Sequence, residues 1–376
     1  QVPSLSTKKI IYLNSSQFSV LQTNSFSAFN TSQIHKFATQ NIPGITTEAV
    51  SNLKDSQLGA LRTIQINKFS TEQIVAISNK FISNISTKSV FNFLTTQLQS
   101  LTTEQISNLS TRQVRSFNTK SISFLSTDQM TAMSPDQVST LVKKQTENLS
   151  FKQVGALENI ISSLVTSAFA KLSTNALTNI STDQLTFLTV EQLISLSTSQ
   201  FKFFQTEQIK ALTSEQIISL ATKKIFNLNT LQIGAIETED FIKMYTSQIQ
   251  GLSTFNVLGL STEMISSITN SQLSAIQTID LKNFDTNQIQ AFSTNVINAM
   301  TTKQIVGLST NQIKAITTDQ IKSLITKQIN AIETRDVRDG LSTNQIFALN
   351  GSQIRSFSTK HINSFNAMQI SAITTE

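Results

Sequence analysis

The sequence contains no cysteine and no tryptophan, and it has only nine glycines and three prolines among 376 residues. The absence of cysteine excludes disulfide bridges, thiolate metal sites and thiol catalysis. The scarcity of glycine and proline leaves no linker between domains, although the chain is longer than one ordinary hydrophobic core organises. Charged residues are also few, at 14%, against about 25% in typical globular domains. The chain must therefore be organised in some way other than as two or three linked globular domains.

Long hydrophobic runs and clusters of charge of one sign are also missing. No run of 18 apolar residues occurs, so we expect no membrane span. The net charge is +6, and the densest basic spots are the pairs Lys8-Lys9, Lys143-Lys144 and Lys223-Lys224. Such scattered lysines are typical of solvated faces, so we expect no specific nucleic-acid partner.

What the sequence does contain is an eight-residue repeat along its whole length. The unit starting at Thr102 reads TTEQISNL and is followed by STRQVRSF, NTKSISFL, STDQMTAM and SPDQVSTL. The register begins at Ser6, and about 46 such octads fit the chain. Their consensus is Ser/Thr-Thr-x-Gln-Ile-x-small-Leu, whose members we number positions 1 to 8. The repeat predicts residues 1–5 as a lead-in, 6–373 as a continuous repeat array, and 374–376 as the start of a further octad.

The spacing of apolar residues within the octad predicts one short helix per repeat. Positions 5 and 8 are three apart and share one helical face, whereas on a strand they would point to opposite faces. A single continuous helix is excluded because its apolar stripe would drift by about 80° per octad. Ser or Thr at position 1 with Gln at position 4 is a capping box, which begins a helix. Pro135 at position 2 agrees, since proline is best tolerated at the first helical position.

Helices of about six residues are unstable alone, so they must share a core with other octads. The sequence therefore predicts an all-α fold, a superhelical solenoid rod of short capped helices. We expect positions 5, 7 and 8 to face inward and positions 3 and 6 to face water. Three or four octads per coil would give a rod on the order of 100–140 Å if helices stack about 8–10 Å apart.

The glutamine column admits two interpretations. The side chains cap their own helices, or they stack between coils as buried amide ladders; both can hold together. The phenylalanines at positions 5 and 8 are expected to fill the core, and the examples considered are Phe18, Phe26, Phe37, Phe204 and Phe292.

Two stretches depart from the repeat. Glu158–Leu172 loses its cap and includes one short unit, placed near Thr166–Leu172, so we expect one longer helix there. Glu333–Leu341 carries one extra residue and the highest charge density. It is the expected site of a kink, bulge or contact, unless it is simply a drifted octad.

No catalytic, cofactor-binding or metal site is predicted. His35 and His361 lie far apart in the chain without partners at ligand spacing, and no glycine-rich phosphate loop or nucleophile elbow occurs. The acidic run Glu237-Thr238-Glu239-Asp240 is interpreted as a solvated helix start rather than as an acid–base pair. We therefore expect no enzyme activity and no cofactor.

The string LTTEQISNLSTRQV resembles the tandem LTxxQIxAL-type octapeptide repeats of very large bacterial secreted and surface proteins. The shared residues are the Leu-Ser/Thr-Thr opening, the Gln-Ile pair and the closing Leu or Ile, and they recur along essentially the whole chain. The resemblance implies a long extracellular stalk, adhesin or fibre. The repeats of transcription-activator-like effectors also open with Leu-Thr-x-x-Gln-Val, but they are about four times longer and carry a base-reading loop that is missing here.

These observations lead to a functional expectation. We expect a non-enzymatic structural protein, extracellular or at the cell surface, that serves as a spacer, tether or filament subunit and is possibly adhesive. The alternative is a solenoid scaffold that binds a protein, glycan or nucleic-acid partner along its surface. Because neither end of the array carries a polar cap, we also expect self-association, end-to-end or side-by-side, or continuation in a longer chain.

Overall fold

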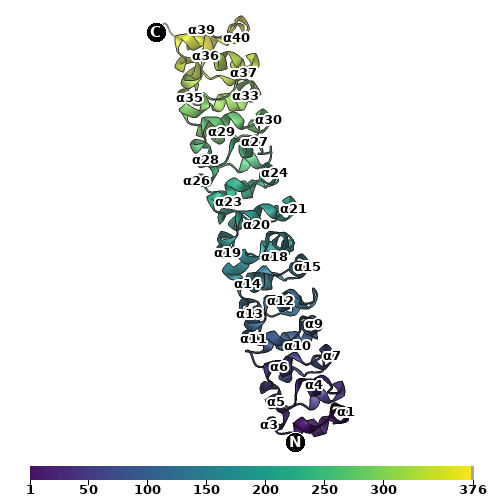
Figure 1. Cartoon of the computed structure of the whole chain (residues 1–376). Coiled ribbons are helices and arrows are strands. Elements are labelled where there is room, and N and C mark those ends of the chain that lie inside the picture. Colours follow the sequence, from purple (N-terminus) through teal and green to yellow (C-terminus); the bar gives the residue numbers. More distant parts are fainter. Residues whose placement is uncertain (374–376) are drawn as a thin grey trace. The chain divides into compact units, whose positions relative to one another are not determined.

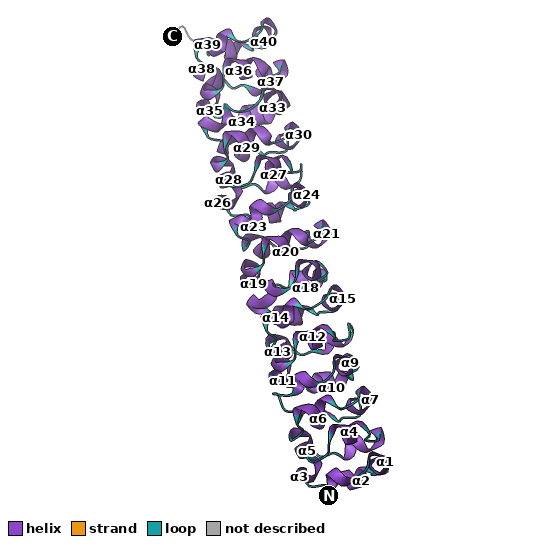
Figure 2. Ribbon diagram, viewed as in Figure 1, coloured by secondary structure: helices purple, strands orange, loops and turns teal. Residues whose placement is uncertain are grey.

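The computed structural model describes residues 1–373, and in this range it consists of short helices joined by loops, without strands (Figure 2). Each regular octad forms one α-helix of four to six residues, beginning at position 2, although several octads form a 3-10 turn instead. The helix of the octad at Thr102 is Thr103–Asn108. The predicted all-α solenoid of short capped helices, one per octad, is confirmed for the described residues. The last three residues, predicted to start another octad, lie outside them.

The chain divides into two compact units, Gln1–Leu196 and Ser197–Glu376, and the division falls between two octads. Within each unit the short helices stack upon one another in chain order (Figure 1). The first unit contains η1 Val2–Ser4, α1 Thr7–Ile10, α2 Ser15–Ser19, α3 Thr23–Phe26, α4 Thr31–His35, η2 Thr39–Gly44, α5 Thr47–Ser51, α6 Asp55–Gly59, α7 Thr63–Ile66, α8 Thr71–Val75, η3 Ile82–Asn84, α9 Thr87–Phe91, α10 Thr95–Ser100, α11 Thr103–Asn108, α12 Thr111–Arg115, η4 Ser121–Phe124, α13 Thr127–Thr131, α14 Pro135–Ser139, α15 Lys143–Thr146, α16 Phe151–Gly155, η5 Glu158–Ser163, α17 Thr166–Phe169, α18 Thr174–Thr178, α19 Thr182–Phe187 and α20 Val190–Ser195. The second contains α21 Thr198–Phe201, α22 Thr206–Lys210, α23 Ser214–Ser219, α24 Thr222–Phe226, α25 Thr230–Gly234, α26 Thr238–Phe241, α27 Thr246–Gln250, η6 Asn256–Gly259, α28 Thr262–Ser267, α29 Asn270–Ala275, α30 Thr278–Leu281, α31 Thr286–Ala291, α32 Thr294–Ile297, α33 Thr302–Gly307, α34 Thr310–Ala315, α35 Thr318–Ser323, α36 Thr326–Ala331, α37 Thr334–Gly340, α38 Thr343–Ala348, α39 Gly351–Arg355, α40 Thr359–Ser364 and α41 Ala367–Ser371.

The apolar residues of positions 5 and 8 form the core of each unit, as predicted. In the octad at Thr102, Ile106 is fully buried and Leu109 nearly so, whereas Glu104 at position 3 and Ser107 at position 6 are exposed. The phenylalanines expected to be core fillers are all buried: Phe18, Phe26, Phe37, Phe204 and Phe292. Pro135 is the first residue of α14, also as predicted.

The expectation that position 7 faces inward is wrong. Ala76 and Ala132 are only partly buried, and Asn108 is exposed. The inward position is instead position 4, where Gln105 is completely buried. Position 7 is small for another reason, since it lies against position 2 of the octad three repeats earlier: a β-carbon on Gly307 would overlap the methyl group of Thr278.

Each octad meets two octads of the preceding coil. Helices three octads apart pack together, as in the series α28, α31, α34, α37 and α40. Hydrogen bonds from position 4 reach the octad four repeats earlier. A coil therefore contains between three and four octads, which agrees with the three or four expected from the sequence.

Of the two interpretations of the glutamine column, the helix cap is confirmed, whereas the buried side chains bond to the main chain of the preceding coil instead of to one another. The Oε1 atom of Gln105 accepts a hydrogen bond from the amide of Thr102 at 3.0 Å, which completes the capping box. Its Nε2 atom donates to the carbonyls of Ile74 and Ile77, both at 2.9 Å, on the preceding coil. The acceptors between coils are thus backbone carbonyls rather than other glutamines, because position 4 lies opposite positions 5 and 8 of the octad below.

Glu158–Leu172 is two short elements, η5 and α17, and not the longer helix that we expected. The short unit is residues 158–164 rather than 166–172. It lacks position 1, and Glu158 takes φ of 44°, the one positive φ of a non-glycine residue in the described chain. One consequence is visible downstream, where Gln184 donates to Val154 across 30 residues instead of the usual 31.

The extra residue of Glu333–Leu341 produces a local bulge, which is one of the alternatives expected for this stretch. The helix α37 runs to seven residues, and the amide of Leu341 bonds to the carbonyl of Asp336, five residues back. The next glutamine, Gln345, compensates by reaching Ile313 across 32 residues. The extra residue therefore remains confined to one octad, and the pattern between coils continues beyond it.

Candidate functional site

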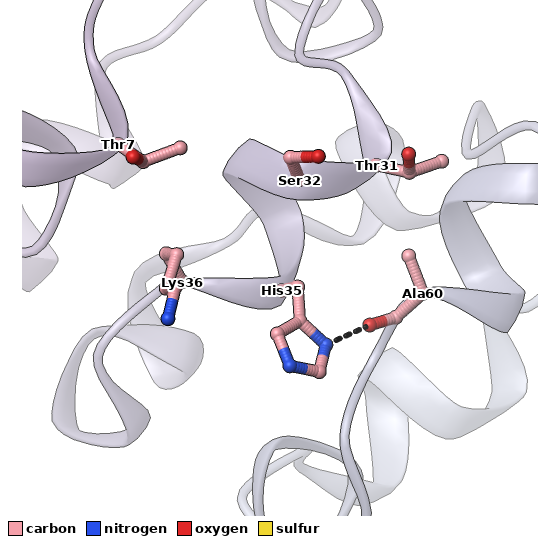
Figure 3. Close-up of a pocket in the computed structure, with 6 residues that line it drawn as sticks. All are labelled: Thr7, Thr31, Ser32, His35, Lys36 and Ala60. Carbon is pink, nitrogen blue, oxygen red and sulfur yellow. Dashed lines mark hydrogen bonds between the residues drawn. The ribbon is translucent and has the colours of Figure 1, made fainter.

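His35 lies on the surface, in a hollow of about 440 Å³ (Figure 3). Its ring Nδ1 lies 3.3 Å from the carbonyl oxygen of Ala60, and the other lining residues are Thr7, Thr31, Ser32 and Lys36. A histidine that acts as a general base is usually oriented by a carboxylate, and none lines this hollow. His35 therefore contacts the next coil in the way that other position-6 side chains do, for example Thr131, which donates to Ala156.

His361 replaces the glutamine of position 4 on α40. It is buried, and its Nδ1 accepts from the amide of Ser358 at 3.2 Å. Burial lowers its pKa, against the opposing effect of a backbone hydrogen bond at Ile332. The ring thus performs the capping half of the glutamine's role, and it also meets the position-8 residue Ile332 four octads earlier.

Within residues 1–373 no cluster of three or more His, Cys, Asp or Glu side chains has a geometry suited to a metal ion. In the same range no helix has the length and apolar character needed to cross a bilayer.

The acidic run Glu237–Asp240 is only partly a solvated helix start, which corrects the expectation. Glu237 is solvated and forms an exposed ion pair with Lys210 at 3.5 Å. Asp240, in contrast, occupies position 4 and is buried, and it accepts a hydrogen bond from the hydroxyl of Ser214. A short carboxylate here lies opposite position 2 of the octad three repeats earlier.

Two further octads have aspartate at position 4. Asp336, on α37, is almost completely buried and accepts from the Thr310 hydroxyl at 2.5 Å and from Arg335 Nε at 3.2 Å. Asp280, on α30, is equally enclosed, with 3% of its surface exposed. Its carboxylate forms no hydrogen bond or ion pair within the described residues, and burial raises its pKa.

Asp280 lies in the wall of a hollow of about 490 Å³ in the second unit, which we call the Asp280 hollow. Its rim carries three strongly exposed apolar side chains, Phe226, Phe255 and Ile279. The complete lining is Lys202, Phe226, Asn227, Leu228, Asn229, Leu252, Ser253, Thr254, Phe255, Gln277, Ile279 and Asp280.

The Asp280 hollow was not predicted, although the sequence carries two signals for it. Apolar Phe255 and Ile279 occupy position 3, where the consensus is polar, and Asp280 replaces the usual glutamine. These residues come together only because octads three repeats apart are neighbours. Octads four repeats apart are neighbours as well, and Arg115 and the pair Lys143-Lys144 line a second hollow of about 510 Å³ in this way.

Comparison with known families finds the model of the ALTTAQ repeat, which matches residues 273–310 and 297–326. Part of the second unit is thus similar to a tandem-repeat family. Comparison with curated proteins finds no match.

Among solved structures, the chain is similar to the leucine-rich repeat-containing protein LegL7 from Legionella pneumophila, at 13% identity over 77% of this chain and 90% of that one. The TM-score is 0.19, so this likeness carries no argument about fold or function.

Proposed function

We propose that this protein is a non-enzymatic structural repeat protein that acts as an extended extracellular rod, stalk or fibre. In this role it is a spacer that holds the partners at its two ends at a fixed separation. The observation that carries the proposal is the repeated hydrogen bond from position 4 to the preceding coil. In each unit a buried glutamine donates to two backbone carbonyls, as Gln105 and Gln312 do. Because the acceptors are main-chain atoms, coils can be added without any requirement on their surface side chains.

The composition supports the same proposal. Charges are few and spread along the chain, and most surface positions are Ser, Thr, Asn or Gln. Such a surface has little electrostatic repulsion between copies, so rods can lie side by side. The octad resemblance, together with the match to a tandem-repeat family, supports membership of a longer repetitive protein that is secreted or displayed at the cell surface.

Small-angle X-ray scattering of a length series tests the spacer role. A variant with residues 269–324 duplicated gains seven octads, which is about two coils. We expect its maximum dimension to grow by about 16–20 Å at constant cross-section, since stacked helices lie about 8–10 Å apart. A maximum dimension that stays constant while the cross-section thickens would contradict the proposal.

Sedimentation velocity on the same two proteins tests assembly. We expect concentration-dependent species larger than the 41.5 kDa chain.

Immunolabelling of intact cells with an antibody to the array tests surface display, and labelling that requires permeabilised cells would contradict an extracellular location.

A further inference from the structure

We propose that the Asp280 hollow binds an alkylammonium group, the chemistry of a lysine side chain or a free primary amine, with the carboxylate of Asp280 as counter-ion and the rings of Phe226 and Phe255 beside the alkyl chain. This binding role goes beyond the spacer function, and it does not depend on it. All of the lining residues belong to the second unit.

The first argument is the unpartnered carboxylate. Asp280 is 3% exposed and has no hydrogen-bond or salt-bridge partner among the described residues. The other two position-4 aspartates, Asp240 and Asp336, each accept a hydroxyl hydrogen bond. An enclosed carboxylate without a partner is costly, and a bound cation would remove that cost.

The second argument is a missing donor. In a regular octad, the glutamine of position 4 donates to the position-8 carbonyl four octads earlier, as Gln288 does to Leu260 at 2.8 Å. Asp280 cannot donate, so the corresponding carbonyl of Leu252, in the same hollow, lacks the amide that a glutamine would supply. Asp280 and Leu252 both line the hollow, and an ammonium group, with three donors and a positive charge, matches a carboxylate and a carbonyl oxygen together.

The third argument is the apolar rim. Phe226, Phe255 and Ile279 are 56%, 79% and 62% exposed. They line the same hollow as Asp280. This combination suits a cation at the end of a hydrocarbon chain, because aromatic faces attract cations and apolar walls accept methylene groups. The chain already contains one such contact, where Lys224 Nζ lies 5.7 Å from the ring centroid of Phe201.

Lys202 also lines the hollow and is the cation within the chain that competes for Asp280. It forms no salt bridge with Asp280, and the basic residues that form ion pairs within the described part of the second unit are Lys210, Lys243, Arg335 and Arg338. Removing its charge should strengthen the binding of an external amine, because a second positive charge in the hollow repels the incoming ammonium group.

The experiment is a titration of the full chain, labelled at isoleucine and leucine methyl groups, followed by NMR. The probes are Nα-acetyl-lysine methylamide, which keeps a free side-chain ammonium group, n-pentylamine, and the neutral analogue Nα-acetyl-norleucine methylamide. We expect the methyl groups of Ile279 and Leu252 to shift with the two amines and not with the neutral analogue. The lysine amide binding more tightly than pentylamine would identify a peptide as the preferred source, and the reverse order would identify a free amine.

Four variants decide the result. Asp280→Gln should fold at least as well as the parent, because it restores the consensus residue, and it should weaken amine binding by about tenfold or more. Phe255→Ala should weaken binding, Lys202→Gln should strengthen it, and the matched control Asp336→Asn should leave it unchanged. The proposal is overturned if the neutral analogue binds as well as the amines, if Asp280→Gln retains binding, or if the Lys202→Gln protein shows no binding.

Discussion

At the scale of the residue, one glutamine makes three hydrogen bonds that most side chains could not make together. Its carbonyl oxygen caps its own helix, and its amide nitrogen joins two carbonyls on the coil below. A carboxylate can do only the first and a lysine only the second. A substitution at position 4 therefore leaves some of these hydrogen-bonding groups without their usual partner, as Asp280 does.

Gln105→Leu is expected to destabilise the first unit by about 2–4 kcal/mol, because the main-chain amide of Thr102 and two buried main-chain carbonyls lose their partner. The neighbouring exposed variant Glu104→Gln should change the unfolding free energy by less than about 0.5 kcal/mol. Urea denaturation followed by circular dichroism measures both, and equal midpoints for the two variants would show that the glutamine bonds contribute little.

Glu158→Gly is expected to stabilise the protein. Glu158 has φ of 44°, and a left-handed conformation costs a side chain that has a β-carbon about 1–2 kcal/mol, a cost that glycine avoids. Part of this gain is offset by the greater freedom of glycine in the unfolded chain. Thermal unfolding should give a higher midpoint for Glu158→Gly and a lower one for Glu158→Val, and the opposite order would contradict the assigned strain.

Lys224→Gln is expected to stabilise the protein in a pH-dependent way. Burial lowers the pKa of Lys224 to about 8, from an ordinary value of 10.5. The folded state therefore favours the neutral amine, and the parent is penalised fully below pH 8 and progressively less as the pH rises to 10.5. The gain from the variant should be on the order of 1–2 kcal/mol at pH 7. Denaturation at pH 7 and pH 10 checks this, and a gain that is independent of pH would refute the burial argument.

At the scale of the element, the octad is the unit of folding because cap, core pair and bond between coils all recur with its period. Deletion of residues 317–324, one whole octad, should leave a folded array, because each neighbour still meets octads three and four repeats away. Deletion of residues 317–320 should be far more destabilising, since it removes a cap and displaces the core positions. Circular dichroism and thermal unfolding compare the two, and similar losses would show that the octad is not the unit.

Most of this element could be predicted from the sequence alone. The cap, the helix start at position 2 and the burial of Ile106 and Leu109 follow from local spacing. Position 7 was misassigned because its small size reflects a neighbour three octads away, which no local pattern reveals. The Asp280 hollow was missed for the same reason. Phe226, Phe255 and Asp280 become neighbours only when the chain coils, and the number of octads per coil cannot be derived from the sequence of one octad.

At the scale of the whole molecule, stability should be local rather than shared. Contacts reach only three or four octads along the chain, so a damaged octad affects its own neighbourhood first. Ile313→Asp, which places a carboxylate in the core, should reduce hydrogen-exchange protection around α34 and leave residues 1–150 protected. Lys314→Asp, at the exposed position 6, is the matched control and should change little. Loss of protection along the entire chain would indicate one cooperative unit.

The fractional number of octads per coil has a mechanical consequence. Because each octad rests on two octads of the coil below, the joints between octads are staggered from one coil to the next, as in brickwork. A tensile load along the stack axis is therefore divided at every level, and the failure of one octad transfers its share to two neighbours. Within each unit, no continuous seam runs parallel to the axis along which a crack could spread.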